Sequence, residues 1–167
     1  MASKQDGKEW VREWILQRTT PFDLLLDVGA CDGIWADLLP GRWLTAVEAF
    51  TPNAEKIVDK YVRVYNCKIQ DFEYPHEVFK LAIFGDVIEH MPVADAQKVL
   101  RYAAERCEEL VVAVPYQYRQ GAIYGNPFEV HVQDDLTPEL MAERYPMLEM
   151  LIRPVPNYAY YHIKGRL

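Results

Sequence analysis

Short apolar runs alternate with segments of helical periodicity along most of this chain, and this alternation restricts the possible folds more than any other feature. Buried strands are predicted at residues 24–26, 43–47, 62–65, 81–84 and 110–114. Helices are predicted before and between them, at residues 1–20, 34–39, 51–61 and 94–106. Strands joined by helices pair in parallel, so we expect an α/β fold: a three-layer α-β-α sandwich around a doubly wound, mostly parallel sheet.

The pattern changes after the fifth strand. Residues 115–136 form a long irregular stretch rich in Tyr, Gly, Pro and Asn, and connections of this length are usually functional or mobile. Thr137-Pro138 then starts a helix that Pro146 stops, and two strands follow at about 147–153 and 158–164. We therefore expect seven strands with an antiparallel last strand.

Composition fits a single folded domain covering residues 1–167. Half of the residues are hydrophobic and 26% are charged, and no repeat or Gly/Ser-rich linker marks a boundary. The 18 Lys and Arg residues against 25 Asp and Glu give a net charge of −7. This balance argues against a broad nucleic-acid-binding surface. The sequence gives no oligomeric signal, so a monomer and a homodimer are both open.

The spacing of the cysteines and the polar first ten residues favour the cytoplasm as the cellular compartment. Cys31, Cys67 and Cys107 are odd in number and lack metal-ligand spacing, which predicts reduced thiols. The first ten residues are polar, unlike a signal peptide, and no apolar run reaches the ~20 residues that span a bilayer. We expect a soluble, cytoplasmic protein without membrane contact.

Acidic residues follow the predicted strands, at the sheet edge where open α/β folds bind ligands. The first strand leads into Asp27-x-Gly29-x-Cys31-x-Gly33, whose glycines permit a tight turn and close approach of a ligand. A dinucleotide fingerprint would read GxGxxG, and a carboxylate at the mouth of the loop would repel a pyrophosphate. Nicotinamide cofactors are thus disfavoured and a cationic ligand is favoured.

Three further acidic positions follow the next strands. Glu48 stands 21 residues after Asp27, the spacing at which a βαβ unit presents a carboxylate to ribose hydroxyls. Asp71-Phe72 follows the third strand, and the segment Gly85-Asp86-Val87-Ile88-Glu89-His90 follows the fourth.

Together these motifs resemble, in order over residues 24–114, those of the class I S-adenosylmethionine-dependent methyltransferases, of the type 11 and type 12 kind. The resemblance implies that the loop from Asp27 through Gly29 and Cys31 to Gly33 holds the methionine moiety and its ammonium group. It implies that Glu48 binds the ribose hydroxyls, that Asp71 reaches the adenine amino group with Phe72 beside the ring, and that Asp86 closes the methionine end. Cys31 departs from the family pattern by replacing a glycine, which narrows the permitted backbone conformations.

The resemblance implies an enzyme that uses S-adenosyl-L-methionine, releases S-adenosyl-L-homocysteine and methylates an oxygen or nitrogen of a small-molecule acceptor by in-line displacement. His90, Glu89 and His131 are the candidate catalytic groups, since a histidine can deprotonate a hydroxyl acceptor. The tyrosines of residues 115–136 are candidates for the acceptor wall or a lid. Trp10 and Trp14 are interpreted as helix residues packed against the sheet.

Two other functions fit the same motifs. Asp86, Glu89, His90 and His131 resemble the divalent-metal ligands of RNA 3′-terminal ribose 2′-O-methyltransferases, although the first acid here is Asp where that family has Glu. A metal-dependent enzyme of this kind is an alternative. A non-catalytic domain that binds S-adenosylmethionine is another.

Overall fold

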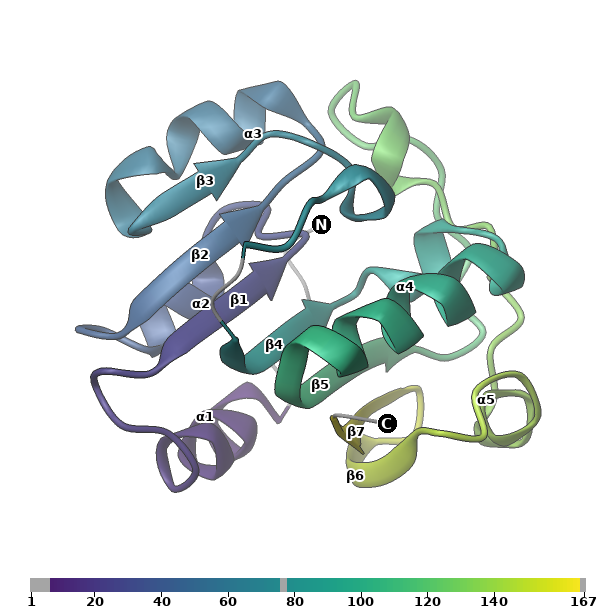
Figure 1. The fold of residues 1–167 in the computed structure, drawn as a ribbon. Helices are drawn as coiled ribbons and strands as arrows, with labels where there is room; N and C mark the ends of the chain where they lie inside the picture. Colours follow the sequence, from purple (N-terminus) through teal and green to yellow (C-terminus); the bar gives the residue numbers. More distant parts are fainter. Residues whose placement is uncertain (1–6, 76–77, 166–167) are drawn as a thin grey trace.

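Seven strands form one sheet in the computed structural model, which describes residues 7–75 and 78–165. The strands are β1 (Leu24–Val28), β2 (Trp43–Val47), β3 (Arg63–Tyr65), β4 (Phe79–Gly85), β5 (Cys107–Pro115), β6 (Glu149–Val155) and β7 (Tyr158–Lys164). Their order across the sheet is β3-β2-β1-β4-β5-β7-β6 (Figure 1). Every pair from β3 to β5 is parallel, and β7 runs antiparallel to both β5 and β6. The predicted mixed sheet is confirmed, including its reversed last strand.

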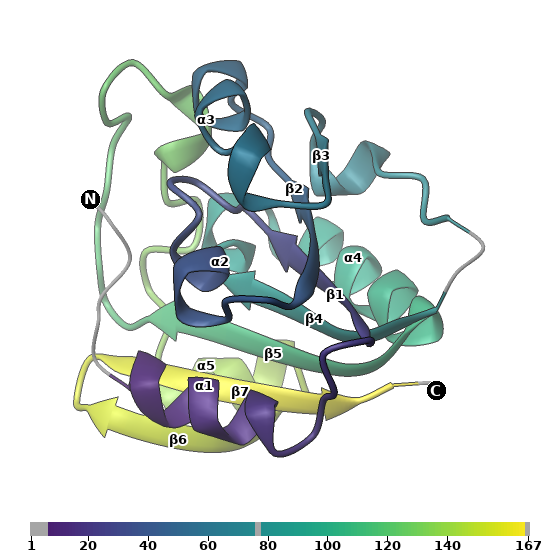
Figure 2. The same cartoon turned by 90° about the vertical axis from the view of Figure 1, so that its left-hand side faces the viewer.

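Helices cover both faces of this sheet. They are α1 (Lys8–Leu16), α2 (Ile34–Leu38), α3 (Thr51–Lys56), α4 (Val93–Arg106) and α5 (Pro138–Arg144), with 3₁₀ turns η1 (Val58–Lys60), η2 (Ile69–Asp71), η3 (Ile88–His90) and η4 (Pro127–Glu129). Helices α4 and α5 pack on the face that carries Leu26 and Val28, and α1 and α2 pack on the face that carries Leu25 (Figure 2). The three predicted layers are present, each face having its own apolar core.

Three local predictions were wrong. The helix after β2 ends at Lys56 and continues only as the turn η1. The helix predicted at residues 1–20 extends only from Lys8 to Leu16, and residues 1–6 lie outside the described part of the chain. On α1, Trp14 is buried as expected, but Trp10 is 44% exposed, because the buried stripe of the helix runs through Val11.

The carboxyl ends of β1, β2, β4 and β5 lie along one edge of the sheet, and the segment 116–136 crosses the same edge (Figure 1). This segment is tied down by Gln133. Its amide Nε2 donates to the backbone oxygens of Ile88 and Met91 at 2.8 and 3.0 Å, and its Oε1 accepts from the hydroxyl of Tyr145 at 2.9 Å. Among the described helices, none has the length and apolar character needed to cross a bilayer.

Candidate functional site

The turn after β1 is built from three left-handed residues. Gly29, Cys31 and Gly33 have φ angles of +69°, +50° and +78°. A Cβ at Gly29 would lie 2.7 Å from Val87 Cγ2, so only glycine fits there. Cys31 adopts this backbone conformation despite its side chain, at a cost of about 1–2 kcal/mol. The turn folds tightly enough to turn backbone N–H groups toward the end of β2.

Glu48 joins that turn to β2. One carboxylate oxygen accepts from the backbone N–H of Cys31 and the other from that of Phe50, both at 2.8 Å. The side chain is buried, and burial raises its pKa while these hydrogen bonds lower it. The carboxylate is therefore held in one orientation, with lone pairs still free to accept further bonds.

Two adjoining cavities open beside Glu48, and we call them the large and the small cavity. The large cavity, of about 390 Å³, lies between the ends of β1 and β2, residues 67–70, residues 86–95 and residues 126–132. The small cavity, of about 90 Å³, lies between the β1–α2 turn, the start of α2, the end of β4 and the segment 115–131. Their walls share five residues, namely Gly29, Cys31, Asp86, His90 and Glu129. The two cavities thus meet along one wall.

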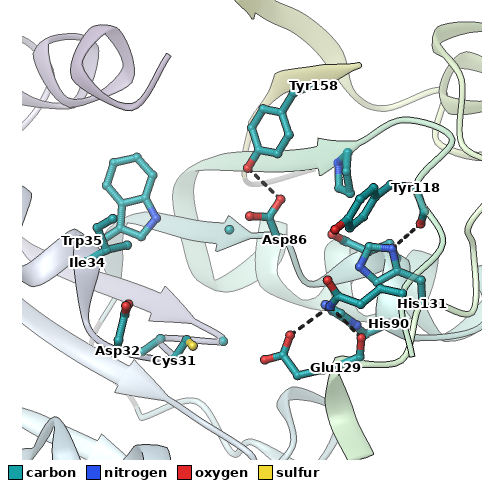
Figure 3. A pocket seen from close by; sticks show the side chains of 16 residues that line it. Cys31, Asp32, Ile34, Trp35, Asp86, His90, Tyr118, Glu129, His131 and Tyr158 are labelled. Atoms are coloured by element: carbon teal, nitrogen blue, oxygen red, sulfur yellow. Dashed lines mark hydrogen bonds between the residues drawn. The ribbon is translucent and has the colours of Figure 1, made fainter. Parts of the chain in front are cut away.

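Asp86 stands at this junction. Its φ is +58°, and its Oδ1 accepts a 2.7 Å hydrogen bond from the Tyr158 hydroxyl (Figure 3). Its Oδ2 is buried and has no hydrogen-bond partner among the described residues. Burial raises the pKa of this carboxyl. In Figure 3 Asp32 and Trp35 lie on one side of Asp86, and His90 and His131 lie on the other.

Two histidines face each other in the small cavity. The ring centroids of His90 and His131 are 4.8 Å apart. The Nδ1 of His90 lies 3.2 Å from the oxygen of Val130, and the Nδ1 of His131 lies 2.7 Å from the oxygen of Tyr118. A carbonyl only accepts, so each neutral ring donates through Nδ1–H and keeps a lone pair on Nε2. Burial, and secondarily the charge of His131, lowers the pKa of His90 to about 4.

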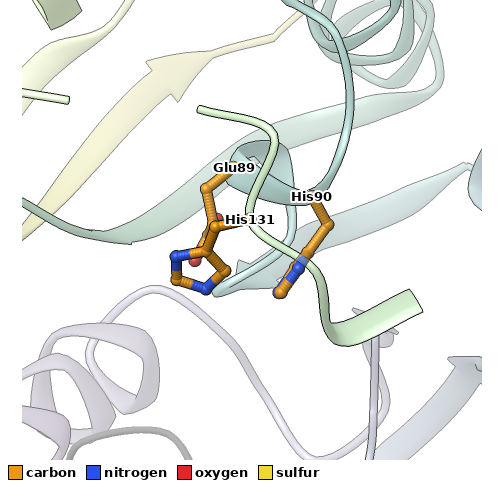
Figure 4. A group of neighbouring side chains, drawn as sticks. All are labelled: Glu89, His90 and His131. Atoms are coloured by element: carbon orange, nitrogen blue, oxygen red, sulfur yellow. The ribbon is translucent and has the colours of Figure 1, made fainter. Parts of the chain in front are cut away.

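Glu89 lies next to these rings (Figure 4). It is fully buried, and neither carboxylate oxygen has a partner in another described residue. Burial and then Asp86 raise its pKa well above the usual value. Potential ligand atoms of Glu89, His90 and His131 lie within 4.8 Å of one another. Three of the four residues suggested for a metal thus come together, whereas Asp86 is outside the group.

Asp27, predicted at the mouth of the loop, lies beneath it. Its side chain is 1% exposed, accepts a hydrogen bond from the Tyr61 hydroxyl, and lines neither cavity. Burial raises its pKa to about 7. Residues alternate between faces along β1, so Asp27 lies on the same face as Leu25, which α1 and α2 cover.

The segment after β3 also differs from expectation. Asp71 is exposed, and Phe72 is buried against the rings of Tyr65 and Tyr74. Neither lines the large cavity; the preceding residues Ile69 and Gln70 do. The 3₁₀ turn η2 is the reason, since it presents its first two residues to the cavity and carries Asp71 to the surface.

Comparison with known proteins adds to this geometry. No protein-family model matches the sequence, and neither does any curated protein. Solved structures match closely in shape. The methyltransferase CcbJ from Streptomyces caelestis superimposes with a TM-score of 0.73 at 11% identity, over 99% of this chain and 98% of CcbJ. An S-adenosylmethionine-dependent methyltransferase from Clostridium acetobutylicum gives 0.71 at 11% identity, over 99% and 92%.

A third match is the N-terminal domain of EvdMO1 with S-adenosylhomocysteine bound, with a TM-score of 0.70 at 12% identity, over 98% of this chain and 83% of that one. This chain has the S-adenosylmethionine-dependent methyltransferase fold. In this methyltransferase fold the two cavities lie at the carboxyl edge of the sheet, as the sequence predicted for a ligand site.

The residues present fit the cofactor that the methyltransferase fold implies. Glu48 offers an oriented carboxylate to a diol. The unpartnered Oδ2 of Asp86 is a buried acceptor in the wall shared by the cavities. Sequence reasoning missed Gln70, Tyr158 and Glu129. No local signal marks them, because they come from an exposed turn, a strand and a loop.

Proposed function

We propose that this protein is an S-adenosylmethionine-dependent methyltransferase that methylates an oxygen or nitrogen atom of a small molecule. One observation carries the proposal: a cavity that contains the fixed carboxylate of Glu48 adjoins a second cavity lined by His90 and His131. The first offers a site for a nucleoside and the second offers proton acceptors. Their common wall would bring a methyl donor and an acceptor together.

Residues of the large cavity hold the nucleoside part of the cofactor. Glu48 accepts hydrogen bonds from both ribose hydroxyls, because each of its oxygens keeps an unused lone pair. Ile69 and Gln70 take the place beside the base that the sequence had suggested for Asp71 and Phe72. The cofactor supplies a methyl carbon on a cationic sulfonium, and Asp32, Asp86 and Glu129 make the small cavity electrostatically favourable for a cation.

The histidine side of the small cavity acts on the acceptor, and the opposite side, at Asp32 and Trp35, is left for the cofactor (Figure 3). His131 accepts its proton through Nε2, since Nδ1–H is held by the oxygen of Tyr118. His90, whose pKa is lowered to about 4, is neutral and lines the same wall, and Glu89 lies buried beside it. The segment 116–136 covers the site and excludes water, which favours displacement of the methyl group by the acceptor over hydrolysis.

Charge and cysteine content bear on the acceptor class and on the cellular compartment. The net charge of −7 disfavours a nucleic-acid acceptor and favours a small molecule. All three cysteines are free, which supports a reducing compartment such as the cytoplasm. The protein functions as one domain, as a monomer or a homodimer.

Calorimetric titration with S-adenosylhomocysteine tests the cofactor assignment. We expect binding by the wild-type protein and a loss of about tenfold or more in affinity for Glu48→Ala. Glu55→Ala, an exposed change on α3, is the matched control and keeps the wild-type affinity. Absence of heat with the wild-type protein, or equal affinity of the Glu48 variant, contradicts the proposal. A screen of hydroxyl and amine acceptors then identifies the substrate class.

The clustering of Glu89, His90 and His131 favours one alternative, a metal-dependent ribose 2′-O-methyltransferase. A bound divalent ion would polarise a ribose hydroxyl there. The acceptor screen, run with and without a chelator, separates the two functions. An undiminished rate in chelator excludes the metal, whereas activity that is lost and then restored by Mg²⁺ or Mn²⁺ supports the alternative. Cofactor binding without turnover of any acceptor points to a non-catalytic domain.

A further inference from the structure

A fully buried lysine lies near the small cavity. Lys8 is the first residue of α1 and has no exposed surface. Its Nζ has no hydrogen-bond partner and no ion pair among the described residues. Burying an uncompensated ammonium group costs several kcal/mol, so such a residue calls for a physical explanation.

The backbone fixes the position of Lys8. Gly7 has a φ of +81°, and a Cβ on it would lie 2.8 Å from Pro154 and 2.9 Å from Tyr160. The oxygen of Gly7 also accepts from the N–H of Val11 at 2.9 Å, which closes the first turn of α1. The chain is thus seated tightly on β6 and β7, and α1 begins at the carboxyl edge of the sheet (Figure 2).

The surroundings of Lys8 are acidic and belong to the small cavity. Its Nζ lies 5.3 Å from the centre of the Trp35 ring. The carboxylates that act most on its charge are Asp86, Asp27 and Asp32, and they oppose the lowering of its pKa by burial. Trp35, Asp86 and Asp32 all line the small cavity. Lys8 therefore stands directly behind this wall.

The wall itself has no cation of its own. Among the described residues that line the small cavity there are four acids, Asp32, Asp86, Glu89 and Glu129, and no lysine or arginine. An anionic group entering this cavity would meet only negative or neutral side chains. The positive charge of Lys8, which acts through a buried region of low dielectric constant, can offset this repulsion and attract the anionic group.

A purely internal role for Lys8 is disfavoured by the unpaired atoms around it. An internal counter-ion would bond to one of the acids, but Nζ contacts none of them, and Asp86 Oδ2 and Asp27 Oδ1 are unpartnered as well. One cation and two acidic oxygens are thus buried near each other and unsatisfied. A ligand that carries both an ammonium and a carboxylate has the charges that match this arrangement.

We propose that Lys8 is a specificity-determining residue whose positive charge lets the small cavity accept the carboxylate of the cofactor's amino-acid end. This inference rests on the proposed function and deepens it. Lys8 selects a complete α-amino acid group over an amine without the carboxylate, while the acidic wall receives the ammonium.

The test compares three ligands by calorimetry on the full chain. They are S-adenosylhomocysteine, its decarboxylated analogue, which keeps the amine, and 5′-methylthioadenosine, which lacks the amino-acid group. The variants are Lys8→Met, Lys8→Arg and the control Lys80→Met, which removes an equal charge from the ion pair with Glu108 at the start of β4. Thermal melting of each variant monitors folding.

The affinities of the two amine ligands are expected to respond differently when the charge of Lys8 is removed. The wild-type protein and Lys80→Met prefer S-adenosylhomocysteine over its decarboxylated analogue by about tenfold or more. Lys8→Met loses this preference: affinity for the carboxylate ligand falls, and affinity for the decarboxylated ligand is unchanged or rises, because the acids are no longer neutralised. Lys8→Arg retains the preference, and no variant changes the affinity for 5′-methylthioadenosine.

A structural role for Lys8 would lower the affinity for all three ligands in parallel, and that result overturns the inference. Equal binding of the two amine ligands by the wild-type protein overturns it even if Lys8→Met does not fold. Binding of none of the three by the wild-type protein is a different outcome, because it contradicts the proposed cofactor itself.

Discussion

The rings of His90 and His131 face each other at a centroid distance of 4.8 Å, although the residues come from a turn after β4 and from the long segment that crosses the site. Each ring donates Nδ1–H to a backbone oxygen, of Val130 and Tyr118 respectively. The pair therefore presents unprotonated Nε2 atoms, and protonation of one ring disfavours protonation of the other.

The first prediction concerns this coupling. In an NMR titration His90 should titrate with a pKa of about 4, below the ordinary value for histidine. His131→Asn should raise that pKa part of the way, because burial, the larger cause, persists. His162→Asn on β7 is the control and should leave it unchanged. An ordinary histidine pKa for His90 in the wild-type protein would contradict the combined effect of its partial burial and of His131.

The second prediction concerns pH and stability. Asp27 keeps its proton to about pH 7 in the folded protein, because burial raises its pKa, whereas the unfolded chain loses the proton near the ordinary aspartate pKa of 3.8. Within that window the unfolded state binds fewer protons, so this residue makes stability fall as pH rises. Asp27→Asn mimics the protonated form. Its free energy of unfolding relative to that of the wild type should rise by about 2 kcal/mol between about pH 5 and about pH 8.

Urea unfolding at the two pH values measures this gain. For Asp59→Asn, an exposed change on η1, the difference in unfolding free energy from the wild type should be the same at both pH values. A constant difference between Asp27→Asn and the wild type across the range would show that Asp27 does not retain a proton on folding.

The third prediction concerns the anchor of the crossing segment. Gln133→Leu removes the amide donor to the oxygens of Ile88 and Met91 and the partner of the Tyr145 hydroxyl. Leaving these buried groups unsatisfied should cost about 2–4 kcal/mol of unfolding free energy. Tyr145→Phe, which removes one hydroxyl, should cost about 1 kcal/mol. Combining the two changes should cost less than their sum, and strict additivity would contradict the shared network.

The fourth prediction concerns the glycine of the β1–α2 turn. Gly29→Ala should destabilise the protein, because the new Cβ lies 2.7 Å from Val87 Cγ2 and because the backbone is left-handed there. Val87→Ala in the same chain should relieve the clash but not the backbone strain of about 1–2 kcal/mol. Partial rescue in chemical unfolding is the expected result; full rescue would mean that the backbone conformation imposes no cost.

Most of the fold could be predicted because its strands are continuous apolar runs. The bounds of β2 and β7 agree with the sequence expectation, and the reversed last strand follows from two strands without an intervening helix. The end of α3 could not be predicted from local pattern. It depends on distant contacts, such as the hydrogen bond from Tyr61 to Asp27.

The candidate site was predictable where a residue's backbone lies at the end of a strand. Glu48 and Asp86 line the cavities as expected. Asp27 was not placed correctly: its alternation with Leu25 along β1 puts it on the face covered by α1 and α2, below the loop. The approach of His131 to His90, and of Lys8 to the small cavity, depends on how distant segments pack, and no local pattern encodes it.

The segment 116–136 supplies walls to both cavities, with residues such as Phe128 in the large one and His131 in the small one. Under the proposed function, substitutions in this segment that reshape the acceptor site would also alter retention of the cofactor. Divergence toward new acceptors in such a chain would proceed through paired changes, one in the segment and a compensating one near Glu48. Transplanting the segment alone into another scaffold would transfer neither property intact.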